Sequence, residues 1–165
     1  MKYTVKMADI KDKPVIHLML QNYLRDLTEF EIISQSESGE YEYPYLKYYW
    51  TENTRYPYLL YCNADISGFA LVRKEEKLFS MAEFSVLPNF RRKGAGTLFA
   101  LDVIHKHPGK WHIEYNIKNN AGKKFWNKLI LNLVGAHYKK GPAEEENREY
   151  LEFTVGEKQL FSHSA

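Results

Sequence analysis

Three consecutive cations stand directly before a pair of glycines in the stretch RRKGAGTLF, residues 91–99. Arg91, Arg92 and Lys93 supply positive charge, and the small residues at 94–96 allow successive backbone N–H groups to converge on one ligand. A strand-like run precedes the stretch and a helix-like pattern follows it, so the positive end of that helix points at the same place. The combination predicts a binding site for a pyrophosphate group.

Two better-known phosphate loops do not fit these residues. A dinucleotide-binding fingerprint needs a third glycine where this chain has Phe99, and a Walker A loop needs a Gly-Lys-Ser/Thr sequence that is absent. A plain glycine turn with solvated cations is the remaining alternative. The position between a strand and a helix favours the anion site.

Hydrophobic periodicity predicts the elements that hold this turn. The first helix is marked by Asp12 and Pro14, and its apolar residues recur at three-and-four spacing as far as Leu27. Strands are predicted at 3–8, 56–62, 69–74, 77–87, 111–117, 134–140 and 148–155, helices at 12–27, 45–50, 97–106 and 121–131, and turns at 63–68 and 141–147. The order β-α-α-β-β-β-α-β-α-β-β predicts an α/β sandwich around a mixed sheet.

Composition excludes several classes of function. The 165 residues are expected to form a single domain, 1–165, and 23 basic against 21 acidic residues argue against a nucleic-acid-binding protein. No apolar run reaches membrane length and no signal-peptide core is visible, so we expect a cytoplasmic protein without a membrane partner. Cys62 is the only cysteine and the histidines are scattered, so no metal site is expected. The sequence leaves open the oligomeric state and the order of the tail at 157–165.

The turn also resembles a known family signature. Arg91-x-x-Gly94-x-Gly96, directly after the strand end Val86-x-Pro88, is similar to the acetyl-CoA signature Arg/Gln-x-x-Gly-x-Gly/Ala of the GCN5-related N-acetyltransferases. That family has a mixed, mostly antiparallel sheet flanked by helices, in the element order predicted above. The resemblance is strongest from 82 to 130.

A second segment supports this resemblance. In the family, a segment of the form Asn-x-x-Ala-x-x-aromatic-aromatic follows the next strand, and this chain has NNAGKKFW at 119–126. Asn119, Phe125 and Trp126 match, and Gly122 stands where alanine is usual. Both segments together are more specific than either alone.

The resemblance implies an enzyme that transfers an acetyl group from acetyl-CoA, its co-substrate, to a primary amine by direct attack on the thioester. The turn would hold the pyrophosphate through backbone amides, the strand edge would pair with the pantetheine arm, Asn119 would bind that arm, and the aromatic pair would close the thioester end. The residues implied at the acetyl-CoA site are Phe84, Val86, Leu87, Arg91, Arg92, Lys93, Gly94, Ala95, Gly96, Thr97, Asn119, Phe125 and Trp126.

Acetyl transfer also needs a base, support for an oxyanion and a proton for the thiolate. Glu83 is the carboxylate nearest to the expected reaction on the central strand and is the candidate base, with a solvated strand residue as the alternative. The backbone N–H near Val86 can support the oxyanion. Trp126 stands where the family often has an acidic tyrosine, so Tyr115, Tyr138 or water is left to protonate the thiolate.

The expected acceptor wall, residues 23–50, is rich in carboxylates and tyrosines. Its carboxylates are Asp26, Glu29, Glu31, Glu37, Glu40 and Glu42. Charge and cation–π contact would suit a cationic amine such as a polyamine, an aminoglycoside or an accessible lysine. Two alternatives stay open: the carboxylates coat a solvated face, or the protein is a sensor that binds acetyl-CoA without turnover.

Overall fold

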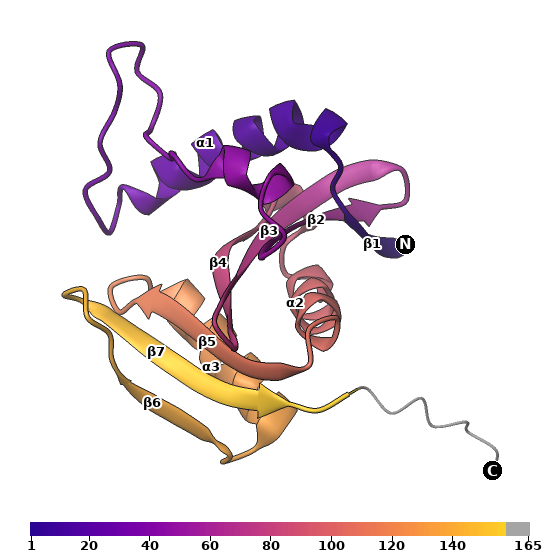
Figure 1. Ribbon diagram of the computed structural model, residues 1–165, viewed down its shortest axis with the longest axis vertical. Coiled ribbons are helices and arrows are strands. Elements are labelled where there is room, and N and C mark those ends of the chain that lie inside the picture. The colour runs from indigo at the N-terminus through magenta and orange to yellow at the C-terminus, as the bar shows by residue number, and fades with distance from the viewer. Residues whose placement is uncertain (158–165) are drawn as a thin grey trace.

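The computed structural model describes residues 1–157, which form a seven-stranded sheet with helices on both faces (Figure 1). The strands are β1 (Tyr3–Met7), β2 (Arg55–Cys62), β3 (Asp65–Glu75), β4 (Leu78–Val86), β5 (Gly109–Asn116), β6 (Tyr138–Pro142) and β7 (Arg148–Val155). The helices are α1 (Lys13–Leu27), α2 (Ala95–His105) and α3 (Asn120–Val134), with short 3-10 helices η1 (Ile10–Asp12), η2 (Leu46–Trp50) and η3 (Pro88–Phe90). The expectation for the tail at 157–165 falls almost entirely outside the described residues.

The strand order is β1-β2-β3-β4-β5-β7-β6, and every neighbouring pair is antiparallel except β4 and β5. The predicted fold class, a mixed and mostly antiparallel sheet flanked by helices, is confirmed. The second predicted helix is present as a five-residue 3-10 helix, in which the Tyr48 N–H donates to the Tyr45 carbonyl three residues back.

Several predicted boundaries were wrong. The turn at 63–68 is only two residues long, because β3 begins at Asp65 and Asn63 adopts the left-handed conformation that such a turn needs. α2 begins at Ala95 rather than 97. α3 runs on to Val134, so β6 begins at Tyr138 rather than 134. In each case the hydrophobic pattern of the side chains continues past the residue at which the helix or strand begins or ends, so the backbone conformation determines the boundary.

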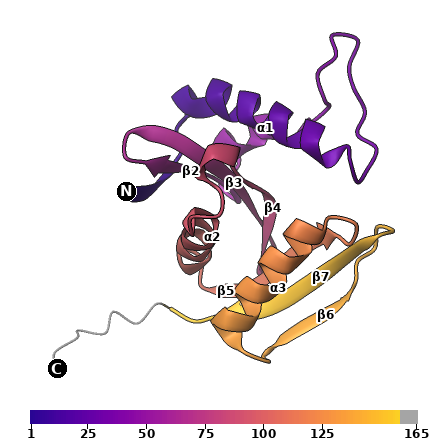
Figure 2. The same ribbon diagram turned by 180° about the vertical axis from the view of Figure 1, so that it is seen from behind.

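The two faces of the sheet have different coverings. α1 buries Ile16, Leu20 and neighbouring apolar residues against Phe69 and Leu71 of β3, and we call this side the α1 face. On the opposite side, the α2/α3 face, the two later helices pack against residues such as Trp111 and Leu151. Figure 2 shows α3 over β5 and β7 from this side. α1 covers the part of the sheet built by the early strands.

A β-bulge sets the orientation of the central strand. Leu71 of β3 pairs with Glu83 and Val72 pairs with Met81, so Ala82 is an extra residue in β4. Met81 and Phe84 both pack in the α2/α3 core, whereas Glu83 lies on the α1 face beside the apolar residues that α1 covers. The bulge therefore turns a carboxylate toward the face that carries the N-terminal elements.

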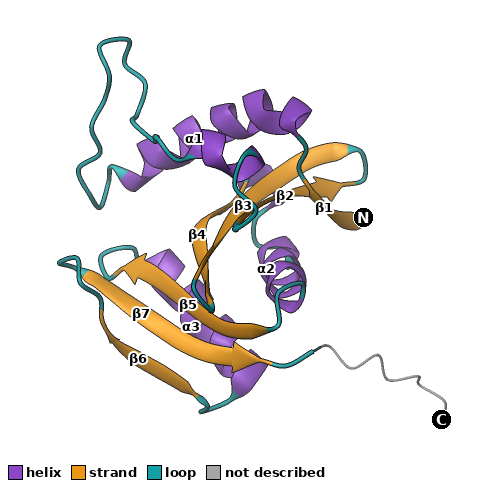
Figure 3. Cartoon of the chain, in the orientation of Figure 1, coloured by secondary structure: helices purple, strands orange, loops and turns teal. Residues whose placement is uncertain are grey.

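β4 and β5 separate soon after they meet. Their parallel pairing covers only Leu78–Ser80 with Lys110–His112, although β4 continues to Val86 and β5 to Asn116 (Figure 3). We call the region in which these two strands run unpaired the β4–β5 split. Strand edges in such a region present unpaired N–H and C=O groups, to which an extended ligand can add as another strand.

Candidate active site

The glycine turn joins the end of β4 to the start of α2. Gly94 is the residue before the helix, with φ of 80°, and no side chain within residues 1–157 caps the helix N-terminus. The N–H groups of the first helical residues, Ala95, Gly96 and Thr97, have no carbonyl within the helix to donate to. Gly94 and Thr97 are exposed. The geometry at this turn is therefore that of an anion site.

The two glycines of the turn serve different purposes. Gly94 needs its positive φ, and open space surrounds the position where a side chain would begin. At Gly96 a Cβ atom would lie 3.2 Å from Phe125 Cε1 and 3.8 Å from Val86 Cγ2. Gly96 thus allows the start of α2 to approach α3 and β4 closely.

The three cations of the turn are exposed, but Arg91 also has a local task. Its Nε donates to the Val86 carbonyl at 2.6 Å, which fixes the turn to the end of β4. Arg92 has φ of 62°, an unusual conformation for a residue other than glycine. Arg92 and Lys93 supply the positive charge that remains around the helix N-terminus.

The main chain of β4 offers fewer groups to a ligand than the sequence implied. The Leu87 N–H donates to the Ser67 carbonyl and the Leu87 carbonyl accepts from the Phe90 N–H, so both groups are already used. Because backbone groups alternate along a strand, those of Val86 and Phe84 point away from β3 and into the β4–β5 split. The Val86 N–H and the Phe84 main chain are thus the groups of β4 that face the split.

Asn119 caps the start of α3, and the aromatic pair belongs to that helix. The Asn119 side chain caps the helix by accepting from the Gly122 N–H at 3.0 Å. Phe125 stacks on Phe84 at 5.7 Å between ring centroids, and Trp126 meets the same ring edge-on at 5.1 Å. The start of α3 therefore lies against the α2/α3 side of β4, in the part of the strand that is not paired with β5.

Glu83 lies in a desolvated position on the α1 face. Its Oε2 atom is buried and has no hydrogen-bond partner among the described residues. Burial raises the pKa of Glu83 to about 8, and the neighbouring Tyr23 hydroxyl and the Arg148 guanidinium act in the opposite direction. A carboxylate with such a pKa is suited to remove a proton near neutral pH. The alternative from the sequence was that Glu83 is a solvated strand residue, and the burial of its Oε2 atom does not agree with that alternative.

Tyrosines from the N-terminal elements surround Glu83. Burial, followed by the Glu83 charge, raises the pKa of Tyr23 well above its usual value and raises that of Tyr43 as well. Burial also raises the pKa of Tyr49 to about 12, and the hydroxyl of Tyr49 is buried without a partner among the described residues. All three phenols therefore stay neutral at physiological pH. No pattern in the sequence predicted that Tyr23 or Tyr43 would approach Glu83.

The tyrosines of η2, with the one directly before it, already contact a cation of the protein itself. The Arg55 guanidinium lies 5.4 to 5.8 Å from three aromatic ring centroids and donates to Glu52 at 2.8 Å. The rings are those of Tyr45, Tyr48 and Tyr49. The sequence had led us to expect these rings to bind a cationic acceptor, but in the structure they already contact Arg55.

The acidic residues of the acceptor wall are mostly solvated. Asp26, Glu29, Glu37, Glu40 and Glu42 are exposed, and Glu40 lies 3.3 Å from His17 on α1. Glu31 is the member whose charge acts on Glu83. The solvated alternative thus describes five of the six carboxylates.

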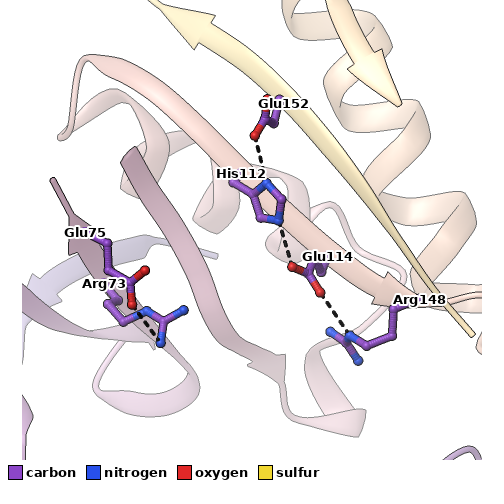
Figure 4. A network of polar contacts seen from close by, with 6 residues as sticks. All are labelled: Arg73, Glu75, His112, Glu114, Arg148 and Glu152. Carbon is purple, nitrogen blue, oxygen red and sulfur yellow. Dashed lines mark hydrogen bonds and ion pairs between the residues drawn. The ribbon is translucent and has the colours of Figure 1, made fainter. Parts of the chain in front are cut away.

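A row of charged groups crosses β5 and β7 on the α1 face (Figure 4). His112 lies between Glu152, at 3.1 Å, and Glu114, at 2.7 Å. Arg148 then joins Glu114, at 3.3 Å, to Glu31 of the loop after α1, at 3.4 Å. This row links the C-terminal strands to the loop that follows α1.

Neither tyrosine that the sequence offered as an acid is well placed. The Tyr115 hydroxyl donates to Glu149 at 2.6 Å and accepts from Asn127 at 2.9 Å. Tyr138 is on β6, three strands from β4, and so about 14 Å away at the usual strand spacing. Of the three proton sources that the sequence left open, these positions favour water over either tyrosine.

Two surface hollows lie elsewhere, one against β6 and β7 and one beside Glu114 and Glu144, and neither includes Glu83. Within residues 1–157, no group of three or more His, Cys, Asp or Glu side chains is arranged to hold a metal ion. In the same part of the chain, no helix is both long and apolar enough to cross a membrane.

Comparison with solved structures identifies the fold. The chain resembles the ribosomal-protein-S18-alanine N-acetyltransferase of Escherichia coli, with a TM-score of 0.65, 12% identity and coverage of 97% of this chain and 98% of that one. It resembles the PaiA N-acetyltransferase of Thermoplasma acidophilum, solved with coenzyme A, with a TM-score of 0.65, 12% identity and coverage of 94% and 100%. It also resembles a GNAT family acetyltransferase of Elizabethkingia anophelis, solved with acetyl-CoA, with a TM-score of 0.59, 15% identity and coverage of 93% of this chain and 98% of that one.

No family model matches the sequence, and no curated protein matches it. The structural likeness extends over nearly the whole chain in each of the three comparisons. The chain therefore has the fold of the GCN5-related N-acetyltransferases, and the resemblance first seen in the glycine turn is confirmed for the fold.

Proposed function

We propose that the protein is an N-acetyltransferase that uses acetyl-CoA to acetylate a primary amine. The observation that carries this proposal is the unpaired edge of β4, which leads from the free N–H groups at the start of α2 to the buried carboxyl of Glu83. An extended ligand with an anionic end and a reactive end matches this arrangement. Acetyl-CoA has both, and it also is bound in a solved structure of the same fold.

The residues present fit this co-substrate. The N–H groups of Ala95, Gly96 and Thr97, with Arg92 and Lys93 beside them, would hold the pyrophosphate. The main chain of Phe84 and Val86 would pair with the pantetheine arm. The rings of Phe125 and Trp126 would cover it from the side of α3, and Asn119 would contact the arm only through the part of its side chain that the cap leaves free.

The transfer needs three contributions from the chain or from water. Glu83 takes the proton that the attacking amine loses as nitrogen bonds to the thioester carbonyl carbon. The Val86 N–H donates to the oxygen on which negative charge develops. When the carbon–sulfur bond breaks, water returns a proton to the thiolate, so the products are an amide and free CoA. In this scheme the chain supplies the Glu83 carboxylate and the Val86 N–H, and water supplies the last proton.

The first experiment is isothermal titration of acetyl-CoA into the wild-type protein and two glycine variants. Gly94→Glu places a carboxylate where the pyrophosphate would bind and should abolish binding. Gly39→Glu is the matched control, because Gly39 has a similar φ of 85° and equally open space. Its affinity should equal that of the wild type. No heat of binding to folded wild-type protein would rule out the proposal.

Release of free CoA with an amine panel then separates an enzyme from a sensor. An enzyme releases CoA at a rate that depends on the amine and falls strongly in Glu83→Gln. Tight binding of acetyl-CoA without amine-dependent release would instead support the sensor. A cationic amine is one acceptor class for this panel, and Glu40→Gln with Glu42→Gln should raise its KM if the exposed carboxylates attract it.

A further inference from the structure

Three buried polar atoms lack a hydrogen-bond partner among the described residues, and their side chains belong to one region. They are Glu83 Oε2, Arg73 Nε and Tyr49 Oη. Buried polar atoms without partners are rare in folded proteins, because each costs free energy unless water or a ligand satisfies it. Three of them together point to a site that a ligand completes.

The strand register places Arg73 and Glu83 on the same face. Leu71 pairs with Glu83, and Arg73 lies two residues further along β3, so its side chain points to the α1 face as well. Two residues of a strand span about 7 Å, which is the separation expected between neighbours of this kind. The Arg73 charge lowers the pKa of Glu83, and the Glu83 charge raises the pKa of Tyr49, as their proximity requires.

Arg73 differs from the other arginines on this face. Arg148 joins two carboxylates, and Arg55 is held by a carboxylate and three aromatic rings, as described above. The ion pair of Arg73 is with Glu75, at 3.4 Å, and both side chains are well exposed, at 39% and 68% (Figure 4). An exposed pair of this kind neutralises a guanidinium weakly, because water screens it. Arg73 therefore has charge available for an anionic ligand.

The chemistry of these atoms defines the ligand. A guanidinium only donates, so it needs an acceptor group, and its flat edge matches a carboxylate. An ionised Glu83 only accepts, so it needs a donor such as an amine. Glu83 and Glu31 nearby would repel a doubly charged group such as a phosphate more than a singly charged carboxylate.

We propose that the acceptor is an amino acid, whose carboxylate binds Arg73 while its amine lies at Glu83. This proposal rests on the acetyl transfer proposed above, and it names the acceptor class of that same site. The Tyr49 hydroxyl can both donate and accept a hydrogen bond, so it can bind either the carboxylate or the amine of the amino acid. Arg73 is thus a residue that determines specificity, separate from the acetyl-CoA residues.

The test compares amino acids with the amines that decarboxylation of each would give, such as lysine with cadaverine and phenylalanine with phenethylamine. CoA release is followed with a thiol reagent. The wild-type protein should prefer at least one amino acid over its matched amine by tenfold or more in kcat/KM, the size of a charge-assisted hydrogen bond. In Arg73→Gln the KM for that amino acid should rise about tenfold or more, and Arg73→Lys should restore part of the loss.

Lys74→Gln is the matched control, because it removes one cation from the same strand but on the other face, where Lys74 lies over the Phe79 ring. Its kinetics should be those of the wild type. Binding of the same amino acids in the presence of CoA, measured by titration, gives a readout independent of turnover. If acetyl-CoA binds and amines trigger the release of CoA, but carboxylates bring no preference in rate or binding, or Arg73→Gln changes neither, the amino-acid proposal is wrong and the acetyltransferase proposal stands. If acetyl-CoA does not bind, both fall.

Discussion

At the scale of single residues, Glu83 is the centre of the candidate chemistry. The alternation of the strand correctly placed it on the face opposite Phe84 and Val86. Its properties, however, depend on Tyr23 and Tyr43, which are 60 and 40 residues away in the sequence and meet it only in the fold. The pKa of the Glu83 carboxyl therefore depends on burial and on neighbouring phenols, which spacing in the sequence does not reveal.

Tyr23→Phe should move the pH dependence of acetyl transfer toward alkaline pH. The Tyr23 hydroxyl opposes the rise in the pKa of Glu83, so its removal raises that pKa further and leaves less carboxylate at neutral pH. We expect kcat/KM to fall roughly tenfold at pH 7 and much less at pH 9. The measurement is a pH–rate profile with one amine throughout, so that the titration of the amine is common to all variants.

Tyr61→Phe is the control, because Tyr61 packs at the same core and Glu83 is not among the groups that shift its pKa. Its profile should match the wild type. Glu83→Gln should lose the rise in the pH–rate profile that reports the ionisation of Glu83, which Tyr23→Phe shifts to higher pH. A profile for Tyr23→Phe that is lowered equally at every pH would mean that Tyr23 acts on packing alone.

At the scale of elements, the start of α3 combines a structural and a binding role. Asn119 closes the first turn of the helix with its side chain, and the adjoining aromatic residues meet β4. The resemblance implied only the binding role. The family pattern does not distinguish a conserved contact from a helix cap, because one amide side chain can serve as both.

Asn119→Ala should reduce the free energy of unfolding by about 1 kcal/mol, the usual cost of losing an N-cap side chain. Urea unfolding measures this. The neighbouring Asn120→Ala, at an exposed helix position, should change stability by less than about 0.5 kcal/mol. An acetyl-CoA affinity that falls in Asn119→Ala and not in Asn120→Ala would add the binding role, whereas unchanged stability in Asn119→Ala would contradict the cap.

The elements themselves were largely predictable, and their ends were not. Apolar spacing identified α1, α2 and α3, and alternation identified the seven strands. The ends depend on backbone conformations, such as those of Asn63 and Gly94, that many residues permit. The bulge at Ala82 and the brief pairing of β4 with β5 had no sequence signal, because the side chains of both strands alternate normally beyond them.

At the scale of the whole molecule, the site lies where two sets of elements meet. Residues from α1, η2 and β3 approach Glu83 on one face, while α2 and α3 approach β4 on the other. The glycine turn was predictable because its residues are consecutive. The acceptor site was not, because Tyr49, Arg73 and Glu83 come from three separate elements.

Glu83→Gln should make the protein more stable at pH 8 than the wild type. The pKa of Glu83 is about 8 in the folded protein and near its ordinary value of 4.5 when unfolded. For a carboxyl whose folded pKa is raised, the stabilising contribution is complete below the unfolded pKa and is lost as pH rises toward the folded value. Wild-type stability should therefore fall by roughly 2 to 4 kcal/mol between pH 5 and 8 relative to Glu83→Gln.

Urea unfolding at pH 5, 6, 7 and 8 measures this difference. Glu75→Gln is the matched control, since Glu75 is exposed on the neighbouring strand and should leave the slope with pH unchanged. Parallel stability curves for the wild type and Glu83→Gln would show that Glu83 is hydrated in solution.

The short parallel pairing of β4 and β5 divides the molecule into two lobes. One contains β1 to β4 with α1 and α2, the other contains β5 to β7 with α3, and the main-chain seam between them is three residue pairs long. The apolar core of the α2/α3 face is shared by both lobes, and the ion pair of Glu31 with Arg148 joins them on the α1 face. A ligand in the split would thus contact both lobes, and its binding would restrict the motion of one lobe relative to the other.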